Sequence, residues 1–205
     1  MVTQVSPLSS CPMMRTFIAC AVPRPLREHL AGIQSRLRGI PLGLRWVKPE
    51  NIHLTLKFLG DTPRHTVDQL REAVDRVAAG RADFTLQAGG LGVFPNLKRP
   101  RVLWVGLSGA TASLAALHAD LEQEAARVDA ERFPCSRRPY RGHLTLGRAR
   151  GRLSPAAVAQ ALKCCADFPS MPFVVDRVLL YRSELKPGGA EYTVLGEARF
   201  NAPNP

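Results

Sequence analysis

Two stretches of this chain alternate polar and apolar residues in the same way. The letters H-L-T-L occur at residues 53–56 and again, unchanged, at residues 143–146. Alternation with a period of two places successive side chains on opposite faces of a β-strand. Each stretch is therefore predicted to be a strand with leucines on a buried face and with a histidine and a threonine on the other face.

The residues that flank the two repeats extend this pattern. The first strand is expected to run from Asn51 to Gly60, with Phe58 on the face of the leucines and Lys57 on the face of the histidine. Arg148 follows the second repeat, and in a regular strand it would point away from the histidine and threonine. Its long side chain, or a kink at Gly147, has to bring it round to them.

The remaining apolar patterns predict four helices and further strands. Thr62-Pro63 and Ser154-Pro155 are expected to open two of the helices. The helices are expected to carry Leu26 to Leu37, Val67 to Val77, Leu114 to Ala125 and Val158 to Cys165. The other strands are expected at residues 15–22, 44–47, 83–88, 91–94, 101–107, 172–181 and 191–200. Several connections are too short for parallel crossovers, so we expect an α+β fold with a largely antiparallel sheet.

The charge of the chain indicates an anionic partner. Lys and Arg number 28 and Asp and Glu number 17, which gives a formal net charge of +11. Such an excess favours a polyanion, with nucleic acid as the first candidate, although composition bias is the alternative explanation. Arginines also gather around the second repeat, between residues 137 and 152.

Composition also bears on the compartment and on metal sites. No apolar run is long enough to span a bilayer. Residues 1–12 lack the features of a secretory signal and are expected to be a disordered N-terminal extension. The five cysteines fit no disulfide framework and no zinc site. We therefore expect free thiols in the cytoplasm.

The repeated motif carries a specific chemistry. Two histidines on facing strands can supply a general acid and a general base to a phosphate without a metal. An unperturbed histidine titrates near pH ~6.5, so one ring can be neutral while the other is protonated. Hydroxyls and cations beside them can stabilise charge on the phosphate oxygens. The predicted catalytic residues are His53 and His143, and the predicted phosphate-binding residues are Thr55, Thr145, Arg148 and Lys57.

These motifs and their flanks resemble a known family. A pair of H-x-[ST]-x motifs is the signature of the two-histidine (2H) phosphoesterase superfamily. The flanking letters R-T-F-I-A, P-E-N before the first motif, K-F-L-G after it, G-V-F-P, P-R-V-L-W and Y-R-S look like its RNA 2′,3′-cyclic phosphodiesterase branch, first described as 2′-5′ RNA ligases. The resemblance spans residues 14–200. One departure is Gly142, where members often have proline before the second histidine.

The resemblance implies a fold and an activity. It implies a bilobal α+β fold in which two pseudo-symmetric lobes of largely antiparallel sheet, with flanking helices, enclose a central cleft. We expect a single domain over residues 13–205, and a monomer. The implied reaction is hydrolysis of a 2′,3′-cyclic phosphate to a 2′-phosphomonoester, with no metal and no cofactor. The implied substrates are RNA with 2′,3′-cyclic phosphate ends or small cyclic-phosphate nucleotides.

Other interpretations of the same residues remain open. A 2′-5′ RNA ligase would run the reverse reaction through the same histidines, using the energy of the cyclic phosphate. A non-catalytic nucleotide- or RNA-binding module is a second alternative, although both histidines and both threonines are intact. A metallohydrolase lacks a third ligand near either motif. Trp46 and Trp104 could stack a base, but core packing is the favoured interpretation of both.

Overall fold

The computed structural model describes residues 12–201. Of the N-terminal extension predicted at residues 1–12, all but Pro12 lies outside the described residues. The helices are α1 (Arg24–Leu37), α2 (Val67–Ala78), α3 (Thr111–Val128) and α4 (Pro155–Cys164), with short 3-10 helices η1 (Pro49–Asn51) and η2 (Arg64–Thr66). The strands are β1 (Met13–Ala21), β2 (Leu44–Trp46), β3 (His53–Pro63), β4 (Phe84–Phe94), β5 (Val102–Gly109), β6 (His143–Ala149), β7 (Met171–Val175), β8 (Arg177–Lys186) and β9 (Gly189–Arg199).

The strands form one curled sheet in which the two motif strands lie at the centre. The order is β7-β4-β5-β6-β3-β1-β8-β9, and β2 pairs with the end of β6. Neighbouring strands in the described chain are antiparallel throughout. Strands β3 and β6 meet at one residue pair, Leu54 opposite Leu144. The prediction of an α+β fold with a largely antiparallel sheet is confirmed.

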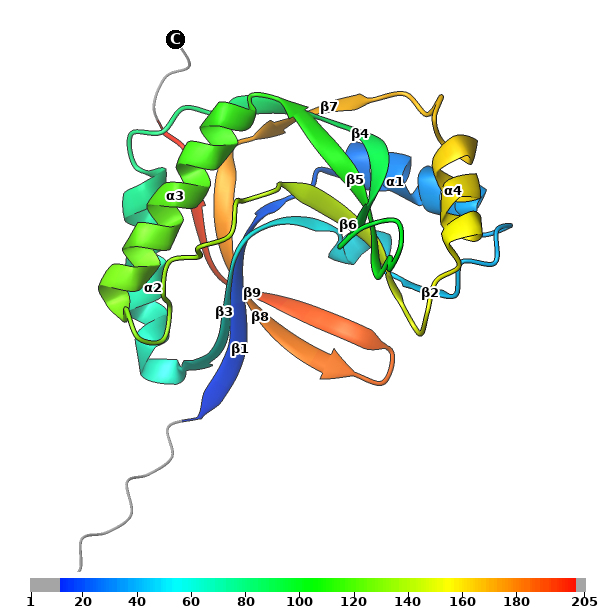
Figure 1. The fold of residues 1–205 in the computed structure, drawn as a ribbon. Helices are drawn as coiled ribbons and strands as arrows, with labels where there is room; N and C mark the ends of the chain where they lie inside the picture. The colour runs from blue at the N-terminus through cyan, green and yellow to red at the C-terminus, as the bar shows by residue number, and fades with distance from the viewer. Residues whose placement is uncertain (1–11, 202–205) are drawn as a thin grey trace, which may run out of the picture.

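The helices cover the sheet in two groups (Figure 1). Helix α2 packs against α3, β8 and β9, while α3 also contacts β3; at the other end, α1 contacts α4 and β7. The motif leucines are buried in the core that these helices complete, and Leu54 and Leu144 have no exposed surface. Burial of apolar side chains therefore fixes which face of each motif strand turns inward.

Two predicted boundaries are wrong. Thr62-Pro63 ends β3 instead of opening a helix, because the buried hydroxyl of Thr62 lies 2.6 Å from that of Thr16 on β1. Residues 84–94 form one strand, since the register shift at Gly90, with φ of 69°, lets the ladder continue past it.

A third boundary is also wrong, while one helix start is confirmed. Residues 172–181 are divided at Asp176, so that β7 pairs with β4 and β8 pairs with β1. The start of α4 is as predicted: the hydroxyl of Ser154 accepts a hydrogen bond from the amide of Ala157 at 3.4 Å.

Candidate active site

The central strand pair brings the two motifs onto one face of the sheet. Because Leu54 lies opposite Leu144 in an antiparallel pair, the histidine of each motif comes opposite the threonine of the other. In a regular ladder, diagonal neighbours on one face are roughly 7–8 Å apart. We call this face the open face; it is defined by His53, Thr55, His143 and Thr145, all of which are partly exposed.

Both imidazoles are oriented by the same local contact. The Nδ1 atom of His53 lies 2.8 Å from the carbonyl oxygen of Asn51, and that of His143 lies 2.7 Å from the carbonyl oxygen of Arg141. A carbonyl oxygen only accepts, so Nδ1–H is the donor in each case. The Nε2 atom of each ring is thereby the one left to take or give a reacting proton.

Aromatic side chains hold the two rings from the sides. The ring centroid of His53 lies 4.7 Å from that of Phe17 and 5.2 Å from that of Tyr192, with the tyrosine edge-on. His143 meets Phe94 edge-on at 4.9 Å. Trp104 also lies on this side of the sheet, with its ring centroid 6.2 Å from that of His143. Its position is therefore beside the second motif histidine.

Burial lowers the pKa of both histidines. The pKa of His53 falls to about 4, first because burial disfavours the charged ring and then because Arg148 and His143 repel a proton; the bond to Asn51 acts in the opposite direction. The pKa of His143 is lowered by burial and by Arg148. Both rings are therefore neutral at pH 7 in the free protein. An anionic phosphate between them would favour protonation of one ring.

A β-bulge follows the threonine of the first motif. Ala19 on β1 pairs with Thr55, and the next residue back along β1, Ile18, pairs with Lys57, so Leu56 is an extra residue in the ladder. One extra residue shifts the alternation by one position and exchanges the two faces of the strand beyond it. Phe58 accordingly turns outward, with 65% of its surface exposed.

The second motif has the same bulge at the equivalent residue. Trp104 on β5 pairs with Thr145 and its neighbour pairs with Gly147, which leaves Leu146 as the extra residue. The buried amide of Gln34 donates to the carbonyl oxygen of Leu146 at 2.9 Å and so satisfies the bulged backbone. The bulge turns Arg148 onto the open face, where its charge acts on both histidines.

Comparison with known proteins identifies the family. The model of the LigT-like phosphoesterases matches the chain twice, over residues 21–104 and over residues 105–192, with one motif in each match. The chain belongs to the LigT-like phosphoesterase family. The double match also agrees with the two equivalent bulges.

Relatives of this LigT-like phosphoesterase have names that describe one activity. A protein of Thermus thermophilus named RNA 2′,3′-cyclic phosphodiesterase is 35% identical, over 89% of this chain and 88% of its own. One of the same name from Methanothermobacter thermautotrophicus is 31% identical, over 88% and 95%. Among solved structures, TT0787 of Thermus thermophilus has a TM-score of 0.77 at 29% identity, covering 93% of this chain and 100% of that one. LigT of E. coli complexed with 3′-AMP has a TM-score of 0.72 at 26% identity, covering 92% and 99%.

Lys57 is not on the open face of this LigT-like phosphoesterase. The prediction that it shares the face of His53 is wrong, because the bulge at Leu56 turns it into the core. Its ammonium donates to the carboxylate of Glu122 at 2.7 Å and to the carbonyl oxygen of Pro134 at 3.0 Å. The side chain is 5% exposed. Lys57 is therefore not available to a phosphate beside the histidines.

Gly142, the residue before the second motif histidine, packs closely against the α3 side of the site. A Cβ atom there would lie 2.7 Å from the Cδ2 atom of Leu114 and 3.2 Å from the Cδ1 atom of Leu107. Glycine permits this close approach of the backbone. The next residue, His143, makes its bond to the carbonyl oxygen of Arg141 from this position.

One contact between the two motifs was not predicted from the sequence. The hydroxyl of Tyr140, three residues before His143, donates to the carbonyl oxygen of Thr55 at 2.9 Å. Its ring stacks on His118 of α3 with centroids 4.0 Å apart. The segment that leads into the second motif is thus tied to the first motif strand. Only its closeness to His143 along the chain could have drawn attention to Tyr140.

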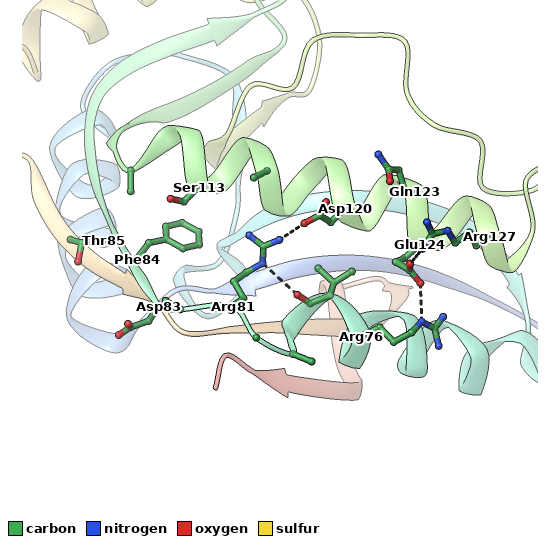
Figure 2. A pocket seen from close by; sticks show the side chains of 16 residues that line it. Arg76, Arg81, Asp83, Phe84, Thr85, Ser113, Asp120, Gln123, Glu124 and Arg127 are labelled. Carbon is green, nitrogen blue, oxygen red and sulfur yellow. Dashed lines mark hydrogen bonds and ion pairs between the residues drawn. The ribbon is translucent and has the colours of Figure 1, made fainter. Parts of the chain in front are cut away.

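A separate groove lies between α2 and α3, near the start of β4 (Figure 2). Its volume is about 1010 Å³. Arg81 pairs with Asp120, and Glu124 lies between Arg76 and Arg127, so each of the three arginines of this groove has a carboxylate partner. The residues that line it do not include any of the predicted site residues.

Two other kinds of feature are absent from the described part of the chain. Between residues 12 and 201, no three histidine, cysteine or acidic side chains are grouped so that they could hold a metal ion. In the same residues, no helix combines the length and the apolar character that crossing a membrane requires.

Proposed function

We propose that this protein is an RNA 2′,3′-cyclic phosphodiesterase that hydrolyses the cyclic phosphate at an RNA end to a 2′-phosphomonoester. The observation that carries the proposal is the geometry of the open face. It holds two imidazoles that are oriented by identical Nδ1 bonds and are placed diagonally across one strand pair. Relatives of the same family that share about a third of the sequence have this activity in their names.

The two histidines divide the proton transfers. A water molecule attacks the phosphorus, and the Nε2 atom of the neutral ring takes its proton. The bond from phosphorus to the 3′ oxygen breaks, and the Nε2–H of the protonated ring gives its proton to that oxygen. The products are a 2′-phosphomonoester and a free 3′ hydroxyl. The protonated ring arises on binding, because the cyclic phosphate is an anion and raises the lowered pKa of its neighbours.

The threonines and Arg148 stabilise charge on the non-bridging oxygens. Within residues 12–201, the hydroxyls of Thr55 and Thr145 have no hydrogen-bond partner, so both are free to donate to a phosphate. Arg148 is exposed and adds a positive charge and a forked set of donors. Donors that are already in place need no reorganisation as negative charge develops.

We further propose a single domain over residues 13–205 that acts as a monomer in the cytoplasm. One continuous sheet and one apolar core over the described chain support the single domain. The four cysteines of residues 12–201 are free thiols, which suits a reducing compartment. Gel filtration with light scattering tests the monomer, since a dimer would elute with twice the mass.

Product analysis tests the activity directly. An RNA oligonucleotide that ends in a 2′,3′-cyclic phosphate is incubated with the protein in excess EDTA, and the ends are identified by phosphorus NMR. We expect a 2′-phosphomonoester as the product. His53→Ala and His143→Ala should each lower turnover about 10²–10⁴-fold, the range for a positioned acid or base. The double variant should lose far less than the product of the two, because the rings act as a unit.

His29→Ala is the matched control. This ring lies on α1 beside Phe168 and is not on the open face, so its removal should leave turnover unchanged. Near-full turnover of a folded His53→Ala or His143→Ala protein would contradict the mechanism. Activity that EDTA abolishes and zinc or manganese restores would also contradict it. A 2′-5′-linked product, formed on adding an RNA with a 5′ hydroxyl, would instead support the ligase interpretation.

A further inference from the structure

A second arginine lies beside Arg148 on the neighbouring strand. Arg45 of β2 and Arg148 of β6 are direct cross-strand partners. Residues in such positions have their side chains on the same face, with Cβ atoms roughly 4.5–5.5 Å apart. Both arginines are exposed, whereas Leu44 before Arg45 is buried. We call Arg45 and Arg148 the arginine pair; both guanidinium groups belong to the open face.

The charge of the arginine pair is not compensated by the protein. Like charges in directly opposed positions destabilise a sheet, so an anion bound between the two guanidinium groups would relieve their repulsion. Ten arginines of residues 12–201 form ion pairs with carboxylates, and neither Arg45 nor Arg148 is among them. Arg101 and Arg150 lie close by along the backbone and are also without a carboxylate partner in that range. Positive charge therefore accumulates at this end of β6.

We propose that Arg45, beside Arg148, binds the phosphodiester that precedes the cyclic phosphate, so that an RNA end is preferred over a free cyclic nucleotide. This inference rests on the function proposed above. The bulge at Leu146 turns the exposed Arg148 to the face of the two histidines and so toward the reacting phosphate. Arg45 lies one strand further out, roughly 4.8 Å away. A bound RNA strand that leaves the histidines over Arg148 meets Arg45 next.

The chemistry of the two possible substrates separates them at Arg45. A nucleoside 2′,3′-cyclic phosphate has one phosphate, which the histidines, threonines and Arg148 already surround. A ribodinucleotide with the same end has a second phosphate on its 5′ side. The planar guanidinium fork matches the two free oxygens of such a phosphodiester, whereas a lysine in its place would supply charge without the fork.

The test compares the two substrates on the same variants. We would measure kcat/KM for a ribodinucleotide that ends in a 2′,3′-cyclic phosphate and for the matching nucleoside 2′,3′-cyclic phosphate. Arg45→Gln should lower kcat/KM about tenfold for the dinucleotide and no more than about twofold for the nucleoside, as expected for one lost charge-assisted contact. Arg45→Lys should fall between Arg45→Gln and the wild type. Circular dichroism and thermal melting confirm that each variant is folded.

Arg64→Gln is the matched control. Arg64 of η2 is exposed, and it too is without an acidic partner among the described residues, but it lies beyond the far end of β3. The substitution removes the same charge and should leave kcat/KM unchanged for both substrates. The salt dependence adds a second measurement. The slope of log kcat/KM against log salt for the dinucleotide should fall by about 0.7 in Arg45→Gln, the value for one phosphate contact on a single strand.

Two outcomes would overturn the proposal. Equal losses on the two substrates would place Arg45 at the reacting phosphate, and no loss on either would remove it from RNA binding. If the wild type hydrolysed neither substrate, the proposed function would be wrong, and binding would then decide on Arg45 separately. The affinities of the dinucleotide 2′-phosphate and of the nucleoside 2′-phosphate would then be measured by titration. The proposed role of Arg45 would hold if Arg45→Gln weakened binding of the dinucleotide only.

Discussion

Replacing Lys57 by methionine is expected to damage stability far more than turnover. The ammonium lies 2.7 Å from the carboxylate of Glu122, and the two side chains are 5% and 10% exposed. Methionine keeps most of the length of the side chain but leaves the buried Glu122 carboxylate without its ammonium partner, while the Nε2 atom of His118 stays 3.5 Å from its other oxygen. Breaking a buried ion pair from one side costs about 3–5 kcal/mol. The amide of Ser136 still donates to Glu122 at 2.7 Å, which places the expected cost near the lower end, about 3 kcal/mol.

That cost is large enough to measure by two routes. Total stability of a domain is about 5–15 kcal/mol, so the urea midpoint should fall clearly. At about 2–4 °C per kcal/mol for a chain of this size, the melting temperature should fall by roughly 6–12 °C. Turnover of a 2′,3′-cyclic phosphate, measured well below the transition, should stay within about twofold of the wild type, because Lys57 faces the core.

The double variant Lys57→Met, Glu122→Leu identifies the cause. With both charges removed, no carboxylate is left uncompensated, and most of the lost stability should return. A double variant as unstable as the single one would show that the cost comes from packing and not from an unpaired charge. A Lys57→Met protein with the wild-type urea midpoint and little turnover would refute the reasoning and return Lys57 to the phosphate.

Further predictions concern the open face. The pKa of His53 is about 4 in the folded protein, below its ordinary 6.5, because the folded protein disfavours the protonated ring. The contribution of His53 to the free energy of unfolding is therefore fully present above pH 6.5 and is lost as the pH falls to 4. The free energy of unfolding of the wild type should therefore drop more steeply than that of His53→Ala across this range, by roughly 3 kcal/mol. Thr145→Ala should lower kcat about tenfold without changing the urea midpoint. Gly92→Ala should lower the melting temperature, since its Cβ would lie 2.2 Å from the Trp104 ring.

The sequence predicted the faces of the motif strands correctly as far as each threonine. Up to that point the pattern is local, because a strand with a period of two needs only to know which side is apolar. Leu54 and Leu144 are fully buried, and His53 and His143 are on the opposite face. The identity of the two tetrapeptides then suffices to predict that both strands present the same side chains.

Beyond the threonines the prediction fails in the first motif because a bulge is not a local property. The extra residue is defined only by the register of the partner strand, and H-L-T-L has no letter that marks it. Near Arg148, the sequence indicates that a long side chain or a kink at Gly147 is needed, whereas unbroken alternation predicts the faces of Lys57 and Phe58. The structure shows that both motifs bend at the equivalent leucine.

Contacts between distant parts of the chain also lay beyond the sequence pattern. Lys57 and Glu122 are 65 positions apart, and neither residue signals the other. The pairing of Arg45 with Arg148 depends on the short strand β2 adding to the end of β6. Such contacts follow from the order of strands in the sheet, which alternation of polar and apolar residues does not determine.

The duplicated motif suits an in-line displacement for a geometric reason. In such a reaction the attacking and leaving oxygens lie on opposite sides of phosphorus, so an acid and a base must also lie on opposite sides. Two equivalent strands that meet at Leu54 and Leu144 place their imidazoles in this relation without any further device. Equivalence alone would leave the two rings interchangeable. The second residue after each extra leucine breaks this equivalence, because Phe58 turns outward beside the first motif, whereas the second motif presents Arg148. Arg148 therefore makes the two sides of the site different, although the repeated tetrapeptide is identical in both motifs.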